Sequence, residues 1–326
     1  MAIFRTLGTA ILATAAAAAA APAWAQDSFP SKPIRIVIPF VAGTGSDGVA
    51  RSMTASLSQT LGVPVTVDNR EGASGMIGTS YVAKAAPDGY TILLAATNMV
   101  LTSFVTDPPP YDPVKDFTNL GRIATVPMVM LTSSKGPYKS FTELVQSAKA
   151  APGKLNYGTS GKMGTSHVFT EQILRQFTFA AKDVHYKNPA QAIIDTAQGQ
   201  PEFLLSNIPL AAGMIQKGDV RVVATGSAKR LTSMPNVPTF GELAGKPDFT
   251  IVLWYGFFVP TGTPAPVRAR LTDAIAKAMQ VPEVRTKIEL TGGQIDIAPS
   301  EVFAKEVEAD TQSFGRLIRD LGLNKP

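Results

Sequence analysis

The sequence predicts an α/β protein made of two doubly wound domains joined by two crossing segments. Strand-like apolar segments alternate with helix-like segments in both halves of the chain, as they do in parallel sheets with helical crossovers. Two Gly-rich segments, residues 34–47 and 155–167, repeat one pattern in which a strand leads into a loop and then into a helix. The chain has 326 residues and 45% hydrophobic content, which is enough to bury two cores.

Residues 1–25 are predicted to be a secretory signal that is not part of the fold. Arg5 gives a positive n-region, residues 10–21 are an Ala-rich apolar stretch, and Ala23-Trp24-Ala25 matches the A-x-A cleavage pattern. The stretch is short for a membrane-spanning helix, and no basic residues follow it. We therefore expect export of the protein and cleavage after Ala25.

The first domain is predicted to comprise residues 26–122 and 251–326. Its first part alternates strands and helices, at residues 33–40, 47–61, 63–67, 77–86 and 90–96. This order predicts a parallel sheet with right-handed crossovers. A Pro-rich connector at residues 107–113 is expected to lead the chain out of this domain.

The second domain is predicted to span residues 123–250. Strands at residues 123–133 and 251–259 are expected to cross between the two domains. Within the second domain, strands are predicted at residues 155–157, 184–186, 203–206 and 220–225, and helices at 140–150, 165–176 and 189–197. The chain is expected to end in helices at residues 265–279, 282–291 and 300–321.

Composition argues against several classes of function. The chain has no Cys, which excludes thiolate catalysis and most structural zinc sites. Its formal net charge of +5 becomes +4 without Arg5, and the basic residues are scattered, which argues against a nucleic-acid partner. We expect no cofactor and no bound metal, and a mildly positive surface that helps to attract small anions.

Both Gly-rich segments have the pattern of an anion-binding loop. Such a loop supplies hydroxyls and backbone N–H groups, and the following helix directs the positive end of its dipole at the same point. In open α/β sheets these loops lie at the carboxyl ends of the strands, where ligands bind. We expect the two loops to face each other across a cleft and to hold a carboxylate.

The first loop also fits the dinucleotide fingerprint G-x-G-x-x-G, in Gly43-Thr-Gly-Ser-Asp-Gly48, with Asp68 at the end of the next strand. The loop before the first Gly is longer than the tight turn of that fingerprint. Asp47 would also repel a pyrophosphate at the start of the helix. We predict instead that Asp47 is the N-cap of the helix, with direct contact to the ligand as the alternative.

The second loop contains the residue types of a serine hydrolase. Ser160, Ser166 and His167 lie close together, but Gly158-Thr-Ser-Gly161 is not the G-x-S-x-G nucleophile elbow. His167 is predicted in the first turn of a helix, where the helix dipole weakens it as a base. His185 is predicted to be a packed or hydrogen-bonded core residue of a strand. Two isolated histidines without Cys argue against a transition-metal site.

Ordered matches along essentially the whole mature chain indicate a family. They are Pro30-Ser-Lys-Pro-Ile-Arg-Ile-Val-Ile-Pro-Phe40, residues 43–51, Asp68-Asn-Arg70 with residues 72–78, Pro87-Asp-Gly-Tyr-Thr-Ile92, residues 158–167, Met234-Pro-Asn-Val-Pro-Thr239, Pro260-Thr-Gly-Thr-Pro264 and Pro282-Glu-Val-Arg285. In these segments the chain resembles the extracytoplasmic solute receptors of tripartite tricarboxylate transporters, the Bug or TctC-like receptors.

The resemblance implies a monomeric periplasmic protein of the type II periplasmic-binding-protein fold that binds a small organic acid and is not an enzyme. It implies a membrane transporter with a large and a small integral subunit as partner. It also implies that both loops contact the ligand, through Phe40, Thr44, Gly45, Ser46 and Asp47 in the first and Thr159, Ser160, Gly161, Thr165, Ser166 and His167 in the second. The alternatives are a secreted serine hydrolase and a ligand-sensing module for a membrane signalling protein.

The sequence departs from the family pattern at the rim of the expected pocket. Val41-Ala-Gly-Thr-Gly45 stands where the family usually has Pro-Ala-Gly-Gly-Gly, which changes the polarity of the first loop. Two uncharged residues after strands, Asn98 and Asn207, are candidates for contact with a distal group of the ligand. Both fit equally well as residues that cap loops.

Overall fold

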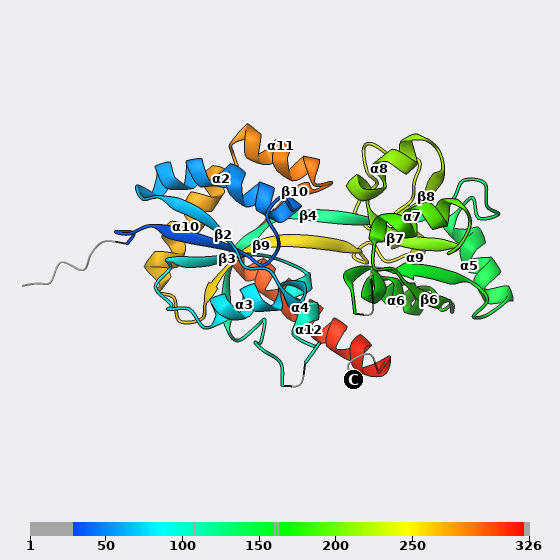
Figure 1. The fold of residues 1–326 in the computed structure, drawn as a ribbon, viewed down its shortest axis with the longest axis horizontal. Helices are drawn as coiled ribbons and strands as arrows, with labels where there is room; N and C mark the ends of the chain where they lie inside the picture. The colour runs from blue at the N-terminus through cyan, green and yellow to red at the C-terminus, as the bar shows by residue number, and fades with distance from the viewer. Residues whose placement is uncertain (1–28, 107, 160, 162, 323–326) are drawn as a thin grey trace, which may run out of the picture.

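The computed structural model describes residues 29–322 except 107, 160 and 162. These residues form two lobes that lie side by side along the long axis of the molecule (Figure 1). Two long strands, β4 (Phe117–Ser133) and β9 (Val252–Pro260), run from one lobe into the other. The chain therefore passes out of the first lobe through β4 and returns to it through β9.

Each lobe contains strands and helices in alternation. The first lobe contains β1 (Ile34–Ile38), α2 (Gly45–Leu61), β2 (Val65–Asn69), the 3₁₀ turn η1 (Ala73–Gly75), α3 (Met76–Ala83), β3 (Thr91–Ala96), α4 (Asn98–Thr102), α10 (Ala265–Ala278), α11 (Pro282–Leu290), β10 (Gln294–Ala298) and α12 (Ser300–Asp320). The second lobe contains α5 (Phe141–Ala150), β5 (Asn156–Thr159), α6 (Thr165–Phe177), β6 (Lys182–His185), α7 (Pro189–Ala197), β7 (Phe203–Asn207), α8 (Ile208–Gln216), β8 (Val220–Thr225) and α9 (Phe240–Ala244).

The strands that the structure describes form one mixed sheet in the order β2-β1-β3-β9-β4-β7-β5-β6, and β8 and β10 also pair with β4. β1 lies parallel to β2 and β3, and β5 lies parallel to β6 and β7, which confirms the predicted parallel units. The sheet of the second lobe is continuous with that of the first, because the two share β4. Strand β4 pairs antiparallel with β9, at Arg122 and Gly256, and with β7, at Val129 and Ser206, and so joins both lobes into one sheet.

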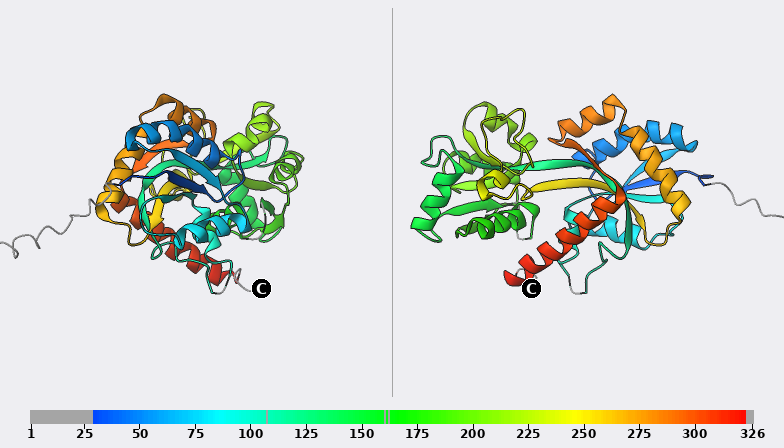
Figure 2. Two further views of the ribbon diagram at one scale, coloured as in Figure 1. Left: turned by 60° about the vertical axis from the view of Figure 1, so that its left-hand side comes forward. Right: turned by 180° about the vertical axis from the view of Figure 1, so that it is seen from behind.

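The last helix, α12, is a third connection between the lobes. Near its start, Phe303 packs against Trp254 of β9 with ring centroids 5.0 Å apart, and the absence of a side chain at Gly256 makes room for it. Near its end, Phe314 lies 5.8 Å from Phe169 of α6 in the second lobe. The view from behind shows α12 running obliquely from the first lobe towards the helices of the second (Figure 2). Apolar packing on α12 therefore links the two lobes.

Candidate functional site

The first Gly-rich loop joins the end of β1 to the start of α2. Helix α2 begins at Gly45, and its N-cap Thr44 has an extended conformation. The Thr44 hydroxyl donates to the carbonyl oxygen of Val41 at 3.0 Å and makes no capping bond to the helix. The N-cap side chain therefore provides no acceptor for the first-turn N–H groups of α2, which begins on the side of its lobe that faces the second lobe (Figure 1).

Asp47 lies inside the first turn of α2, so the prediction that it is the N-cap is wrong. The helix begins earlier than predicted, and the Asp47 carboxylate reaches back to accept the N–H of Gly43 at 2.9 Å. It also accepts from Nε of Arg51 and Nδ2 of Asn69, each at 3.0 Å. Burial alone would raise the pKa of Asp47, but these hydrogen bonds outweigh it and lower the pKa below its usual value. Asp47 therefore fixes the shape of the loop as an ionised group.

The other predicted residues of the first loop lie around this anchor. The ring of Phe40 packs against the core of the first lobe, and its carbonyl oxygen accepts from Asn69 at 3.0 Å. The hydroxyl of Ser46, a buried residue, is 3.4 Å from that of Thr44. Gly45 approaches the residue after α11, because a Cβ atom there would lie 3.0 Å from Cγ2 of Thr291. Residues 41–43 of the loop are exposed, and two hydroxyls lie at the start of the helix, where Ser46 is buried.

The second Gly-rich loop joins β5 to α6. Its helix begins at Thr165 as predicted, and the N-cap is Gly164, which has no side chain to cap the first turn. Gly161 has φ +117°, in the region that favours glycine, and its N–H donates to the hydroxyl of Thr159 at 3.2 Å. Ser160 lies outside the described residues. This loop, like the first, delivers small polar residues to a helix N-terminus.

A histidine and an aspartate on β6 hold the hydroxyl of Thr159. His185 Nδ1 is 2.8 Å from Thr159 Oγ1, and His185 Nε2 is 2.9 Å from Asp183 Oδ2. A ring whose Nε2–H donates to the carboxylate and whose Nδ1 carries no proton can accept the hydrogen bond of the Thr159 hydroxyl. His185 is exposed, so the prediction that it lies in the core is wrong, whereas the predicted alternative to packing, a hydrogen-bonded histidine, is confirmed. It orients a hydroxyl of the second loop instead.

His167 lies in the first turn of α6, as predicted, and closes its own loop. Its Nδ1 accepts the N–H of Met163 at 3.2 Å. The equivalent bond in the first loop runs from Gly43 to Asp47, and each acceptor is the third residue of its helix. The two loops therefore share one local design.

The rings of His167 and His185 have centroids 5.4 Å apart, so the prediction of two isolated histidines is wrong.

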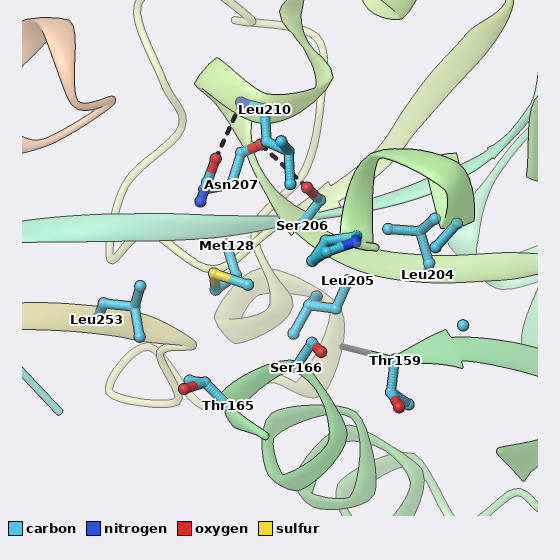
Figure 3. Close-up of a pocket in the computed structure, with 13 residues that line it drawn as sticks. Met128, Thr159, Thr165, Ser166, Leu204, Leu205, Ser206, Asn207, Leu210 and Leu253 are labelled. Carbon is cyan, nitrogen blue, oxygen red and sulfur yellow. Dashed lines mark hydrogen bonds between the residues drawn. The ribbon is translucent and has the colours of Figure 1, made fainter. Parts of the chain in front are cut away.

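A pocket of about 220 Å³ opens beside the second loop. Figure 3 shows Thr165 and Ser166 of α6 on one side of it and Asn207 and Leu210 on the opposite side. The lining residues come from β4, β5, α6, α7, β7, α8 and β9, and they are Met128, Gly158, Thr159, Thr165, Ser166, Pro189, Ala192, Leu204, Leu205, Ser206, Asn207, Leu210 and Leu253. The pocket therefore reaches from the second loop to both crossing strands.

Residues of the first loop line a different depression. Gly43, Thr44 and Asp47 face it together with Glu283 and Lys287 of α11. Of the predicted site residues that the structure describes, Thr159, Thr165, Ser166 and Asn207 line the pocket at the second loop.

The two predicted asparagines have different surroundings. Asn207 is the N-cap of α8, where its Oδ1 accepts the N–H of Leu210 at 3.0 Å, and it also lines the pocket. Asn98 is the first residue of α4, and its Nδ2 donates to the carbonyl oxygen of Ser74 at 2.8 Å. Asn207 therefore has a capping role, as predicted, and also faces the pocket, whereas Asn98 tethers the Gly-rich turn before α3.

Several site residues were not predicted from the sequence. Asp183 and His185 are two residues apart on one strand and so share a face of it, which is a signal that the sequence contains. The pocket residues Met128 and Leu253 lie on crossing strands and are apolar, as core residues are. Nothing in their sequence context distinguishes them from other apolar strand residues.

The described part of the chain has neither a metal site nor a membrane span. Over residues 29–322, with three positions left out, no group of three or more His, Cys, Asp or Glu is placed to hold a metal ion. Within the same residues, no helix is both long and apolar enough to cross a membrane.

Two lobes joined by crossing strands, with a pocket at a helix N-terminus beside those strands, define the class of the solute-binding receptors. The model of the tripartite tricarboxylate transporter family receptor (TctC) matches residues 49–323. The chain belongs to this family, whose receptors are periplasmic. BugT of Bordetella pertussis is 31% identical over 94% of this chain and 94% of that protein.

Two solved structures resemble the whole fold. MatC of Rhodopseudomonas palustris, with bound malate, is 28% identical with a TM-score of 0.69, over 89% of this chain and 100% of that one. Rpa4515 of R. palustris, with adipate, is 29% identical with a TM-score of 0.71, over 90% of this chain and 98% of that one. These likenesses confirm the predicted fold class.

Proposed function

We propose that this receptor captures a small organic carboxylate between its lobes and delivers it to a tripartite tricarboxylate-type membrane transporter. The observation that carries the proposal is the pocket at the start of α6, where hydroxyls meet the positive end of a helix dipole. An anion bound there needs no buried cation, because hydroxyl and N–H donors supply charge-assisted hydrogen bonds.

The relatives support a carboxylate as the ligand. MatC is solved with malate and Rpa4515 with adipate, and both are carboxylates. Hydrogen bonds to a charged group contribute about 1.5–3 kcal/mol each. A few such bonds provide the roughly 8 kcal/mol of micromolar binding after the cost of association.

We further propose that the lobes close on the ligand so that both loops contact it. The contacts would come from hydroxyls and backbone N–H groups at the two helix starts, with Asn98 and Asn207 available to a distal group. The proposed ligand contacts are Phe40, Thr44, Gly45, Ser46, Asp47, Asn98, Thr159, Ser160, Gly161, Thr165, Ser166, His167 and Asn207. Closure is a population shift driven by the better contacts of the ligand in the closed form.

The remaining parts of the proposal concern the organisation of the chain and its partners. Residues 1–25 form a cleavable signal, residues 26–122 and 251–326 one domain, and residues 123–250 the other. The mature protein is a periplasmic monomer. Its partners are the large and the small integral subunits of the transporter.

The test is a calorimetric screen of the mature chain against aliphatic and aromatic monocarboxylates and dicarboxylates. We expect saturable binding of at least one carboxylate. A ligand present at about 100 times its dissociation constant raises the free energy of unfolding by about 2.7 kcal/mol, which thermal unfolding measures independently. Absence of heat and of thermal stabilisation with every carboxylate would contradict the proposal.

A further inference from the structure

The pocket at the second loop has a polar side and an apolar side. Thr159, Thr165 and Ser166 lie where β5 ends and α6 begins. The rest of the wall includes Met128, Leu205, Leu210 and Leu253 from four different elements, with Ser206 and Asn207 beside Leu210 (Figure 3). A ligand with its carboxylate at the start of α6 would therefore place the rest of its structure against thioether and aliphatic groups.

The apolar side is part of the pocket rather than a hidden core. Met128 and Leu205 are buried, at 5% and 3% exposure, and form its floor, whereas Leu210 keeps 45% of its surface exposed at the first turn of α8. An apolar ligand group that covered Leu210 would remove this surface from water. Each buried methylene strengthens binding about fourfold.

The same wall is unsuited to a second carboxylate. None of the lining residues that the structure describes is charged. Asn207 uses its oxygen to cap α8 and has only its amide N–H groups left to offer a ligand. One amide group can serve a hydroxyl or keto group, whereas a second carboxylate removed from water would need several donors, as the start of α6 supplies for the first.

We propose that the ligand is a monocarboxylate with an apolar tail, and that the tail contacts Met128, Leu205, Leu210 and Leu253. This inference rests on the proposed function and narrows its substrate class. It separates this chain from MatC and Rpa4515, whose structures hold the dicarboxylates malate and adipate. Selectivity comes from the apolar wall, because the helix N-terminus accepts the first carboxylate of either class.

The first experiment compares matched acids by calorimetry at constant pH and salt. Butyrate, hexanoate and octanoate are titrated against succinate, adipate and suberate, which have the same chain lengths. We expect affinity to rise about fourfold per methylene in the first series until the pocket is filled, and each diacid to bind at least about tenfold more weakly than its partner. Equal or tighter binding of the diacids would overturn the inference and leave the proposed function intact. Failure of every acid to bind would overturn both.

The second experiment places a cation on the apolar side. Leu210→Lys is compared with the control Ile194→Lys on α7, because Ile194 has a similar exposure of 40% and does not line the pocket. We expect Leu210→Lys to strengthen diacid binding about tenfold and to weaken monoacid binding, and Ile194→Lys to change neither. The same ratio of diacid to monoacid affinity in both variants would overturn the placement of the tail.

Discussion

At the scale of single residues, the first loop depends on Asp47. The sequence predicts a structural role for Asp47, and the structure shows one. The predicted start of the helix is wrong, because Gly45 and Ser46 have weak helix propensity and do not indicate a first turn. The carboxylate gathers donors from the loop, from its own helix and from β2. These three contacts come from separate elements, so only the folded chain brings them together.

Replacing Asp47 with Ala is therefore expected to cost about 2 kcal/mol of unfolding free energy, because the N–H of Gly43 loses its acceptor. Carboxylate affinity should fall as well, since the loop loses its fixed shape. Urea unfolding measures the first effect and calorimetry the second.

The matched control is Asp273→Ala, which breaks another Asp–basic pair at the same helical spacing, Asp273 with Lys277 at 2.9 Å. That pair is exposed, so its loss should cost less than about 0.5 kcal/mol. Equal losses in the two variants would show that Asp47 is an ordinary surface ion pair.

At the scale of elements, the long helices and buried strands were predictable and the short elements were not. Helices α10, α11 and α12 have clear periodicity and follow the predictions within a residue or two. The short helices α4, α8 and α9 and the strand β10 were not predicted. A helix such as α4, with five residues, is shorter than two turns and has no periodicity to detect. Strand β10 forms only through its pairing with β4.

Because α12 bridges the two lobes through apolar packing, loss of that packing should destabilise the whole chain. Phe314 is 2% exposed and packs against Phe169 of the other lobe, so Phe314→Ala should cost about 3–5 kcal/mol of unfolding free energy. The milder Phe314→Leu should cost less than about 1.5 kcal/mol and keeps the test usable if the Ala variant fails to fold.

The comparison variant is Asp320→Ala, which removes the 2.9 Å ion pair between Asp320 and Arg175 on the same two helices. Both partners are about half exposed, so we expect a loss below about 1 kcal/mol in urea unfolding. If Asp320→Ala were the more damaging change, the bridge would be ionic rather than apolar.

At the scale of the whole molecule, the sequence predicted two lobes of parallel units but not their union in one sheet. Each parallel unit is built from consecutive strands and helices, so their alternation in the sequence predicts it. The joining of the two lobes in one sheet depends on β4, which has 17 residues. One part of β4 pairs with β9 and β10, and the other part pairs with β7 and β8. Which strands meet there is decided by long-range packing.

The contact between α12 and a crossing strand has a pH dependence. Asp310 accepts a hydrogen bond from Trp254 Nε1 at 2.9 Å, and burial, with the charge of Glu306, raises the pKa of Asp310 to about 6. Between roughly pH 4 and 6 the folded chain holds this proton and the unfolded chain releases it, so the unfolding free energy falls as the pH rises through this window. The loss is at most about 3 kcal/mol, and less where solvent reaches the carboxylate.

Unfolding measured from pH 4 to pH 7 should therefore show a shallower decline in Asp310→Asn than in the wild-type chain. Asp320→Asn, an exposed position on the same helix, should keep the wild-type profile. Parallel profiles for the wild-type chain and Asp310→Asn would refute the assignment of the proton to Asp310.

The most direct test of a carboxylate held by both loops is hydrogen–deuterium exchange, with and without a saturating carboxylate from the calorimetric screen. We expect amide exchange to slow in residues 43–48 and in residues 158–167 together, because the ligand and lobe closure cover both helix starts. Slowing in only one of these segments, or in neither, would contradict the clamp.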